Sequence, residues 1–501
     1  MAYPAQLHKT LPVISTVAYA QGLLTISVGY LLARIIYNVY FHPLAHFPGP
    51  FLARSTMLWR FWHTMSGRSH RAFQEQHQIY GPVFRVSPNE LTFASVESWR
   101  GIYGTPGTGK PHVTKSEFYD IYGAGFKVGC IGSERDPQVH ARKKKSLAGA
   151  FSLKALNAQD TITQRCIDGL VDKLGRLSSE SPKGVNVVEW YEMVAFDILG
   201  EMAFGESFGC VEREEHHFWI RLILDHLVEI SLVDNLRRIG ILAKLGRWFL
   251  PWLTTSVRNK HSGYSRAKVE QRLNSKNNRQ DFLTTIVDKV QSGEIPKEEM
   301  TAHASTLIIA GGETVATSLA GATYHLLRTP SAYQKLKDEV RGRFGSYEEI
   351  DGAAALQLPY LQAVINEALR IHPSGAQGFP RLSPGTVIDG HWVPKGVEVY
   401  TSAWTITHDA RNFHDPMVFK PERWTDPDCA DIKEASQPFS LGLRACIGRN
   451  FAYLEMASLL AKIVYRYEME LCDKKLDWED ASRFHIMWWK APVNVRFSPC
   501  A

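Results

Sequence analysis

One ten-residue stretch, Phe439–Gly448, constrains this chain more than any other feature, because it places a cysteine in a glycine-containing loop directly before a helix. Glycines permit backbone conformations and close approaches that a side chain would block, and Arg444 adds a cation two residues before Cys446. Residues 449–464 are predicted to form a helix, so Cys446 lies near its partly positive N-terminal end. This position favours a thiolate with a low pKa, which acts as a nucleophile or as a metal ligand.

A lone cysteine in such a loop is more often a buried structural residue than a ligand. Here every defined position of the pattern F-x-x-G-x-R-x-C-x-G is present, and the pattern resembles the haem-binding loop of the cytochrome P-450 superfamily. The resemblance implies that haem b is the cofactor, that Cys446 is the proximal ligand of its iron, and that Phe439, Arg444 and Gly448 belong to the binding loop. Thiolate ligation pushes electron density toward iron and favours O–O cleavage.

Composition sets the broad class of protein. The 501 residues are 45% hydrophobic and 22% charged, which is ordinary for a globular chain with a large core. The net charge of +6 is too small to indicate nucleic acid, so we expect no nucleic-acid partner. Seven scattered cysteines without a Cys-x-x-Cys pair argue against a disulfide framework or a zinc site and fit a reducing compartment.

An uncharged segment near the N-terminus predicts a membrane anchor. Residues 11–33 carry no charge and would make about 35 Å of helix, enough for a hydrocarbon core of about 30 Å. A cleaved signal peptide, with Ala18-Tyr-Ala20 as the cleavage site, and an amphipathic helix are the alternatives. Arginines follow the segment, so the positive-inside rule places the main body in the cytosol. We therefore expect a single anchor in the endoplasmic reticulum membrane.

The proline-rich stretch 41–50 resembles the hinge of microsomal cytochromes P-450. Its local sequence is similar to that of filamentous-fungal members of the family. We expect residues 1–40 to form the anchor and the start of the hinge, and residues 41–501 to form a single haem-binding monooxygenase domain. The resemblance implies a mainly α fold with small β-sheets, in which haem lies between a long buried helix and the cysteine loop. Residues 81–93 predict a hairpin, and residues 101–132 predict a long loop over the distal side of the haem.

The long buried helix is predicted at 296–328. Two adjacent glycines, Gly311 and Gly312, cost about 1 kcal/mol each in a helix interior, and an unpaired buried Glu313 is expensive. Such violations point to function; a packing crossover with a satisfied Glu313 is the alternative. The resemblance implies that the glycines leave room for dioxygen, that Thr314 positions water beside it, and that Glu313 relays protons. Family members often carry a second alcohol where this chain has Val315.

The resemblance also implies ligands for the haem propionates. Arg381 and Arg444 match propionate-binding arginines of the family. His140 and Lys144 replace the Trp and Arg that family members often carry on the preceding helix, and a lysine offers a point charge instead of a planar fork. The remaining cations of that run, at 142–145, would face an acidic electron donor.

Two further motifs resemble the scaffold of the family. Glu367 and Arg370 lie three residues apart on a predicted helix and resemble the E-x-x-R element. Arg423 lies in a stretch that resembles the P-E-R-F element. Together the three residues are expected to form a buried network beside the haem loop.

The predicted activity is a haem-thiolate monooxygenase that uses NADPH–cytochrome P-450 reductase, and possibly cytochrome b5, to insert oxygen from dioxygen into a lipophilic substrate. The fungal resemblance suggests a terpenoid or polyketide of secondary metabolism. Two alternatives are an electron-independent isomerase or dehydratase and a non-catalytic haem-binding sensor. Candidate pocket walls are Phe126, Ile308, Ala310, 374–379, Ile486, Met487 and Trp488.

Overall fold

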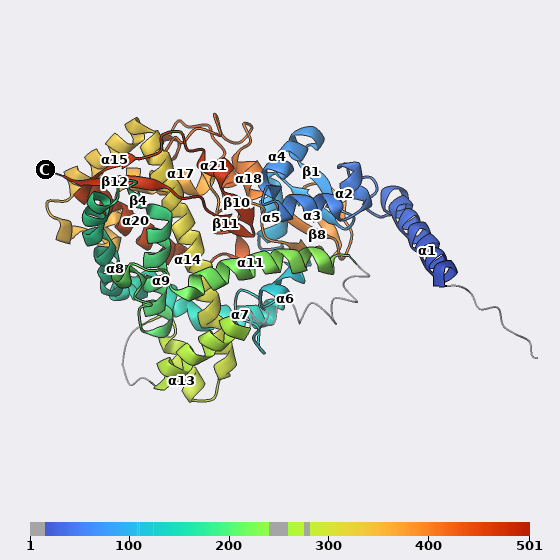
Figure 1. Ribbon diagram of the computed structural model, residues 1–501, viewed down its shortest axis with the longest axis horizontal. Coiled ribbons are helices and arrows are strands. Elements are labelled where there is room, and N and C mark those ends of the chain that lie inside the picture. The colour runs from blue at the N-terminus through green and yellow to red at the C-terminus, as the bar shows by residue number, and fades with distance from the viewer. Residues whose placement is uncertain are drawn as a thin grey trace, which may run out of the picture.

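The computed structural model describes residues 16–107, 109, 111–123, 125–239, 259–274 and 281–500. It confirms a mainly helical fold with small β-sheets. Figure 1 shows a broad helical body from which the N-terminal helix α1 projects, while the C-terminus lies at the opposite end of the body.

The projecting helix covers most of the predicted anchor. The predicted segment starts at Leu11, outside the described residues; within them α1 spans Thr16–Ile36 and continues as a π-helical turn over Tyr37–Phe41. Residues Ala18–Phe41 are long and apolar enough to cross a membrane, by length and composition. The helix therefore runs past Arg34, and the hinge is confined to residues 42–50.

Five strands form the largest sheet, in the order β1-β2-β8-β5-β3. The predicted hairpin is confirmed as antiparallel β1 and β2, and β8 pairs parallel to β2. The segment predicted as a long loop contains strand β3 and helix α6 as well, since pairing with β5 satisfies its backbone groups. The bounds are β1 Val83–Ser87, β2 Glu90–Phe93, β3 Thr114–Lys115, β5 Arg381–Leu382, β8 Glu398–Thr401 and α6 Phe118–Tyr122.

The other strands form smaller sheets. One has the order β4-β12-β9, and β6-β7 and β10-β11 are two-stranded pairs. Their bounds are β4 Val185–Asn186, β6 Thr386–Ile388, β7 His391–Val393, β9 Tyr467–Leu471, β10 Arg483–His485, β11 Met487–Trp489 and β12 Asn494–Pro499.

Helix α14, Lys297–Arg328, runs through the interior, as predicted for 296–328. It packs along α9, Val187–Phe204, and against α17, Pro359–Ile371, and α20, Arg449–Arg466. The helices that matter next are α3 Leu58–Met65, α5 Val96–Tyr103, α7 Pro137–Ala148, α8 Leu153–Glu180 and α11 Phe218–Arg237. Other helices are α2 Phe51–Ser55, α4 Ser69–Tyr80, α10 Cys210–Arg213, α13 Thr284–Gln291, α15 Pro330–Arg343, α16 Gly352–Ala355, α18 Ala403–Thr407, α19 Glu422–Thr425 and α21 Trp478–Ala481, and residues 259–274 are helical as well.

Gly311 and Gly312 lie where α14 meets α9. A Cβ atom at Gly311 would lie 2.9 Å from Leu199, and one at Gly312 would lie 2.6 Å from Phe196. Only glycine therefore lets the two helices approach so closely. Close packing of α9 therefore accounts for both glycines, and their predicted role in leaving room for dioxygen stays a prediction.

Candidate functional site

The cysteine loop is held by glycine geometry and by its own backbone. Gly442 has φ of +67°, and a Cβ atom there would lie 2.5 Å from the carbonyl oxygen of Tyr103 at the end of α5. The loop then closes on itself, because the Cys446 N–H donates to the Phe439 carbonyl oxygen at 2.8 Å. Helix α20 begins at Arg449, three residues after Cys446.

The thiol of Cys446 does not titrate as the sequence suggests. Burial raises the pKa of Cys446, and the N–H groups of Gly448 and Arg449 and the charge of Lys144 only partly offset that rise. The predicted low pKa is therefore wrong for the chain by itself: removal of the thiolate from water outweighs the favourable end of the helix.

Exposed residues occur in the cysteine loop, on α14 and after α17. The Cys446 side chain keeps exposed surface, although atoms of the surrounding chain desolvate the thiol and raise its pKa. Ala310 is likewise exposed on α14, although residues 301–309 of the same helix are all buried. Phe379 is 41% exposed. Its carbonyl oxygen accepts a hydrogen bond from the hydroxyl of Tyr103, and the backbone of Tyr103 lies close to Gly442 of the cysteine loop.

Three cations gather beside the loop without a carboxylate partner. Lys115 lies opposite Arg381 in the pairing of β3 with β5, and the charge of Arg381 acts on Arg444. Lys115 donates to carbonyl oxygens of Ile131 and Gly132, and Arg381 donates to Tyr119 Oη. Within the described residues none of the three cations forms an ion pair with a carboxylate.

The repulsion between these cations lowers the pKa of two of them. Burial, together with Arg381 and Arg444, lowers the pKa of Lys115 well below its usual value. Burial and Arg381 lower the pKa of Arg444 to about 10. A cluster of buried cations that repel one another is one that an anion would relieve. The donor set thus fits the carboxylates of a haem, with Cys446 as the thiolate donor.

His140 and Lys144, the two residues of α7 predicted to bind the haem propionates, lie in different surroundings. His140 is buried near the cations, and burial with Arg444 and Lys115 lowers its pKa to about 3, so it is a neutral imidazole. Lys144 instead donates to the carbonyl oxygens of Leu443 and Ala445, each at 3.0 Å. Lys144 therefore supports the cysteine loop through two of its three N–H groups, and its contact with a propionate stays a prediction.

The neighbouring cations of α7 also differ from one another. Lys143 is buried and pairs with Glu134 at 3.0 Å, so the prediction that it faces an electron donor is wrong. Arg142 and Lys145 are exposed. Only these two keep the surface position that the prediction requires.

The adjacent residues Glu313 and Thr314 point into different surroundings. Thr314 is half-buried, and its Oγ1 donates to the Ala310 carbonyl oxygen at 2.7 Å, on the open side of α14. Glu313 is fully buried and accepts from Lys490 Nζ at 2.5 Å, and Lys490 also pairs with Glu192 of α9 at 2.8 Å. Burial raises the pKa of Glu313 to about 7, although Lys490 opposes that rise.

The scaffold residues come together in one buried network. Arg370 donates to both Glu367 oxygens at 2.8 and 2.9 Å, and Arg423 donates to the same carboxylate at 3.0 Å. Trp424 donates its indole N–H to Glu367 as well, and Arg423 also pairs with Asp431. Every oxygen of Glu367 is thereby satisfied without solvent.

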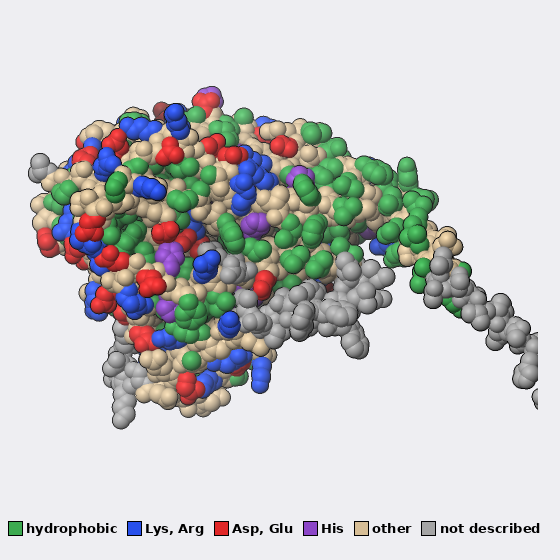
Figure 2. Space-filling view, viewed as in Figure 1, with side chains coloured by type: hydrophobic (Ala, Val, Ile, Leu, Met, Phe, Trp, Pro, Cys, Tyr) green, Lys and Arg blue, Asp and Glu red, His purple; other side chains and the backbone are tan. Residues whose placement is uncertain are grey.

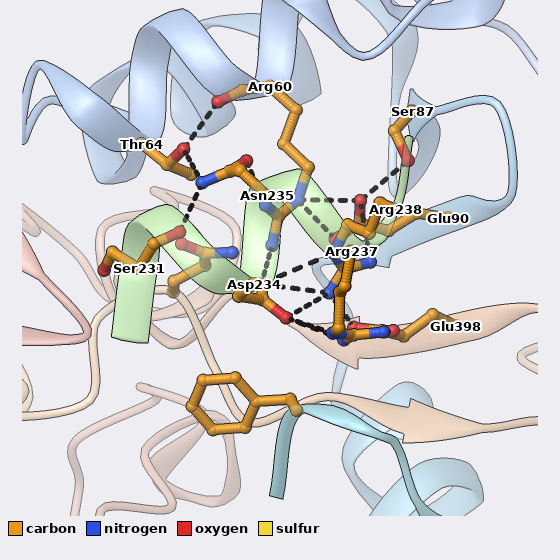
Figure 3. Close-up of polar contacts among 12 residues, drawn as sticks. Arg60, Thr64, Ser87, Glu90, Ser231, Asp234, Asn235, Arg237, Arg238 and Glu398 are labelled. Carbon is orange, nitrogen blue, oxygen red and sulfur yellow. Dashed lines mark hydrogen bonds and ion pairs between the residues drawn. The ribbon is translucent and has the colours of Figure 1, made fainter. Parts of the chain in front are cut away.

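A second buried charge cluster lies beside a cavity of about 40 Å³ and ties α11 to the rest of the body. Figure 3 shows Arg60 of α3 reaching Asp234 of α11 and Glu90 of β2, with Arg237 and Arg238 completing the cluster toward Glu398 of β8. Arg60 lies 2.9 Å from Asp234 and 2.8 Å from Glu90. The cavity is lined by Arg60, Thr64, Ser69, Phe118, Ser231, Asp234, Asn235, Gly375, Gln377, Gly378, Phe379, Pro380, Tyr400, Phe484, His485 and Ile486.

The residues predicted to wall the pocket lie in different surroundings. Phe379 and Ile486 line the cavity beside the Arg60 cluster, and Ala310 is exposed on α14. Ile308 and Trp488 are completely buried, and Met487 is nearly so, which makes them core residues. Phe126 is half-buried against the ring of His261.

Sequence reasoning missed Lys115, Lys490 and the cluster around Arg60. Lys115 lies in a short strand whose partner, β5, is more than 260 residues away, so only the fold reveals its position. Lys490 carried a usable signal, because it is a single charge between Met487-Trp-Trp489 and Ala491-Pro492. A lone charge in an apolar stretch predicts a buried partner.

Comparison with known proteins gives a consistent result. The family model described as Cytochrome P-450 matches residues 48–496. Cytochrome P-450 monooxygenase ORF9 of Penicillium roqueforti (strain FM164) is 56% identical over 469 residues, covering 93% of this chain and 92% of the relative. Cytochrome P-450 monooxygenase BOT4 of Botryotinia fuckeliana is 49% identical over 474 residues, covering 94% and 90%. Cytochrome P-450 monooxygenase cpaH of Aspergillus oryzae is 37% identical over 487 residues, covering 96% and 94%.

Proposed function

The chain belongs to the cytochrome P-450 family and is a cytochrome P-450 monooxygenase, and we propose that it inserts one atom of dioxygen into a lipophilic small molecule, using haem b held by Cys446. The second oxygen atom leaves as water, with two electrons from NADPH delivered by NADPH–cytochrome P-450 reductase and possibly through cytochrome b5. All three relatives described above are monooxygenases by name, so the isomerase and sensor alternatives are not retained.

One observation carries this proposal: within the described residues, Lys115, Arg381 and Arg444 lie together by the loop of the exposed Cys446 and form no ion pair with a carboxylate. Cys446 would hold the iron, and Lys115, Arg381 and Arg444 would bind the two propionates. His140 would add one neutral N–H donor, and Phe439 and Gly448 would shape the loop. When bound, the haem supplies oxidation chemistry that a thiolate ligand directs toward O–O cleavage.

Thr314 on the open side of α14 and the buried Glu313 beside it would supply and position protons. The Thr314 hydroxyl, beside the exposed Ala310, can hold a water molecule close to the reacting oxygen. Glu313 holds a proton near neutral pH, because burial raises its pKa to about 7. General acids act best when the pKa lies near the working pH.

The outer surface supports a membrane location. Figure 2 shows apolar side chains gathered over the end of the body from which α1 projects. Phe41 and Trp62 are each 72% exposed there, and Phe51 is 65% exposed. We propose an anchor in the endoplasmic reticulum membrane, residues 41–501 as one cytosolic domain, and a substrate, such as a terpenoid or polyketide of secondary metabolism, that enters from the bilayer.

Isotope incorporation tests the proposed reaction. The membrane-bound protein, a cytochrome P-450 reductase and NADPH are incubated under ¹⁸O₂ with extracts of a strain that lacks this chain. The proposal predicts a product that carries one ¹⁸O atom and forms only with reductase present. A product formed without reductase, or without ¹⁸O, would contradict it.

A further inference from the structure

One lysine is shared between two buried carboxylates next to the oxygen-handling helix. Lys490 follows β11, Glu313 lies on α14 and Glu192 lies on α9. The ammonium is 2.5 Å from Glu313 and 2.8 Å from Glu192, and the exposed fractions of the three side chains are 1%, 0% and 8% in the order Lys490, Glu313, Glu192. If all three groups are charged, the group carries one excess negative charge.

That excess charge is expensive inside a protein, so one carboxylate is favoured to take up a proton. Glu313 is the better acceptor, because its Oε1 has no hydrogen-bond partner while Oε2 contacts Lys490. The charged or titratable groups that act on Glu313 are Lys490, Glu192 and His216. Burial and Glu192 raise the pKa of Glu313, while Lys490 and His216 lower it, giving about 7.

The Glu313 side chain points away from the open side of α14. Consecutive residues on a helix point about 100° apart, and Thr314 occupies the open side beside Ala310. Glu313 instead points toward Lys490 and Glu192. To deliver a proton beside Thr314, Glu313 must leave Lys490. Glu192 can then keep the ammonium paired, so that no buried charge is stranded.

We propose that Lys490, shared between Glu192 and Glu313, is a positioning residue that controls when Glu313 carries a proton and turns toward Thr314; this rests on the proposed function of Glu313. The protonated Glu313 leaves Lys490, gives its proton to the oxygen being reduced, and returns to Lys490 as a carboxylate. Solvent water supplies the next proton. Glu192 acts as the alternative partner that allows Lys490 to release Glu313.

Infrared titration of the haem-loaded protein tests this control directly. The band of the protonated Glu313 carboxyl is identified by its loss in Glu313→Gln. Glu192→Gln removes the like charge and is expected to lower the titration midpoint of Glu313 by about one pH unit, a tenfold change in proton affinity. Lys490→Met is expected to raise the midpoint by at least as much, and Lys490→Arg to stay near wild type.

A matched control is Glu455→Gln. Glu455 is a buried carboxyl on α20, and burial raises its pKa to about 8. Its removal should delete a different band and leave the Glu313 midpoint unchanged. Should Lys490→Met fail to fold, Glu192→Gln still carries the test, because it keeps the pair between Lys490 and Glu313.

The connection to the reaction is measured as the ratio of hydrogen peroxide to oxidised product across pH. The proposal predicts that Glu192→Gln shifts the pH midpoint of this ratio downward together with the infrared midpoint. Infrared midpoints that do not move in opposite directions for Glu192→Gln and Lys490→Met would overturn the proposal. A shifted infrared midpoint with an unshifted ratio would overturn it too. Failure of wild type to oxidise any substrate would instead contradict the proposed function, since the infrared test needs no turnover.

Discussion

At the scale of single residues, the site is dominated by charge that the chain does not neutralise by itself. Lys115, Arg381 and Arg444 donate to carbonyl and hydroxyl oxygens, which satisfy their geometry but not their charge. Such a cluster stores unfavourable energy in the haem-free protein and releases it when an anion binds. Binding of the cofactor and stability of the chain are therefore expected to be linked.

Lys115→Gln is expected to separate these two effects. The pKa of Lys115 is lowered in the folded protein, so between that lowered pKa and about pH 10.5 the folded state binds fewer protons than the unfolded state. The stability of the haem-free protein therefore rises with pH across that window. The substitution removes this rise and stabilises the haem-free protein at pH 7 by about 1 kcal/mol, while haem is lost faster from the loaded protein.

The measurement is urea unfolding of haem-free protein at pH 7 and 9, followed by haem-loss kinetics. Lys145→Gln, at an exposed position of α7, serves as the control and should change neither result. An equal pH dependence in wild type and Lys115→Gln would show that Lys115 carries no strained charge.

The residues of the cysteine loop were predictable because their spacing is local and chemically specific. Lys115 and Lys490 were not, since each acquires its role from partners far away in sequence, Arg381 in one case and Glu192 in the other. The low pKa expected for Cys446 failed for a related reason. The nearby helix end could be read from sequence, but the larger effect of burial could not.

At the scale of elements, close packing of α9 against α14 fixes the frame of the site. Gly312→Ala should disturb it, although alanine favours helix by about 1 kcal/mol over glycine. The new Cβ atom would lie 2.6 Å from Phe196, so the two helices must move apart. We expect a loss of about 1–3 kcal/mol in unfolding free energy, typical of overpacking.

Gly342→Ala in α15 is the matched control, because nothing lies within 4 Å of its Cβ position. Chemical denaturation should show a small gain for this variant and a loss for Gly312→Ala. A higher unfolding free energy in both variants would mean that α9 and α14 are not tightly packed at Gly312.

The charge cluster of Figure 3 is the second connection between elements. Burial acts to raise the pKa of Asp234, but Arg238, Arg60 and Arg237 hold it well below its usual value. Its ionised form therefore stabilises the fold above about pH 4, and this contribution disappears as the pH falls through the lowered pKa. Asp234→Asn is expected to cost about 3–5 kcal/mol at pH 7, because it leaves buried cations short of one anion.

Asp480→Asn provides the comparison, since Asp480 pairs with Arg68 and Arg71 at the surface. Exposed pairs contribute about 0–1 kcal/mol. Urea unfolding of both variants at pH 7 measures the difference in unfolding free energy. Similar small decreases in the two variants would mean that the charge cluster does not hold α11 to the sheet.

At the scale of the whole molecule, an exposed apolar helix is joined to a mainly helical body with small β-sheets. The order of helices and the hairpin could be predicted, because apolar periodicity and turn residues are local signals. The five-stranded sheet could not, since β3, β5 and β8 each contain four residues or fewer and pair across long distances. The central claim at this scale is that the helical body holds a haem ligated by Cys446.

The reduced carbon-monoxide difference spectrum of purified wild type and Cys446→Ser tests that claim most directly. We predict a red-shifted band of the thiolate type in wild type, and loss of that band in a Cys446→Ser protein that remains folded. A band of the imidazole type in wild type, or folded wild type that binds no haem, would contradict it.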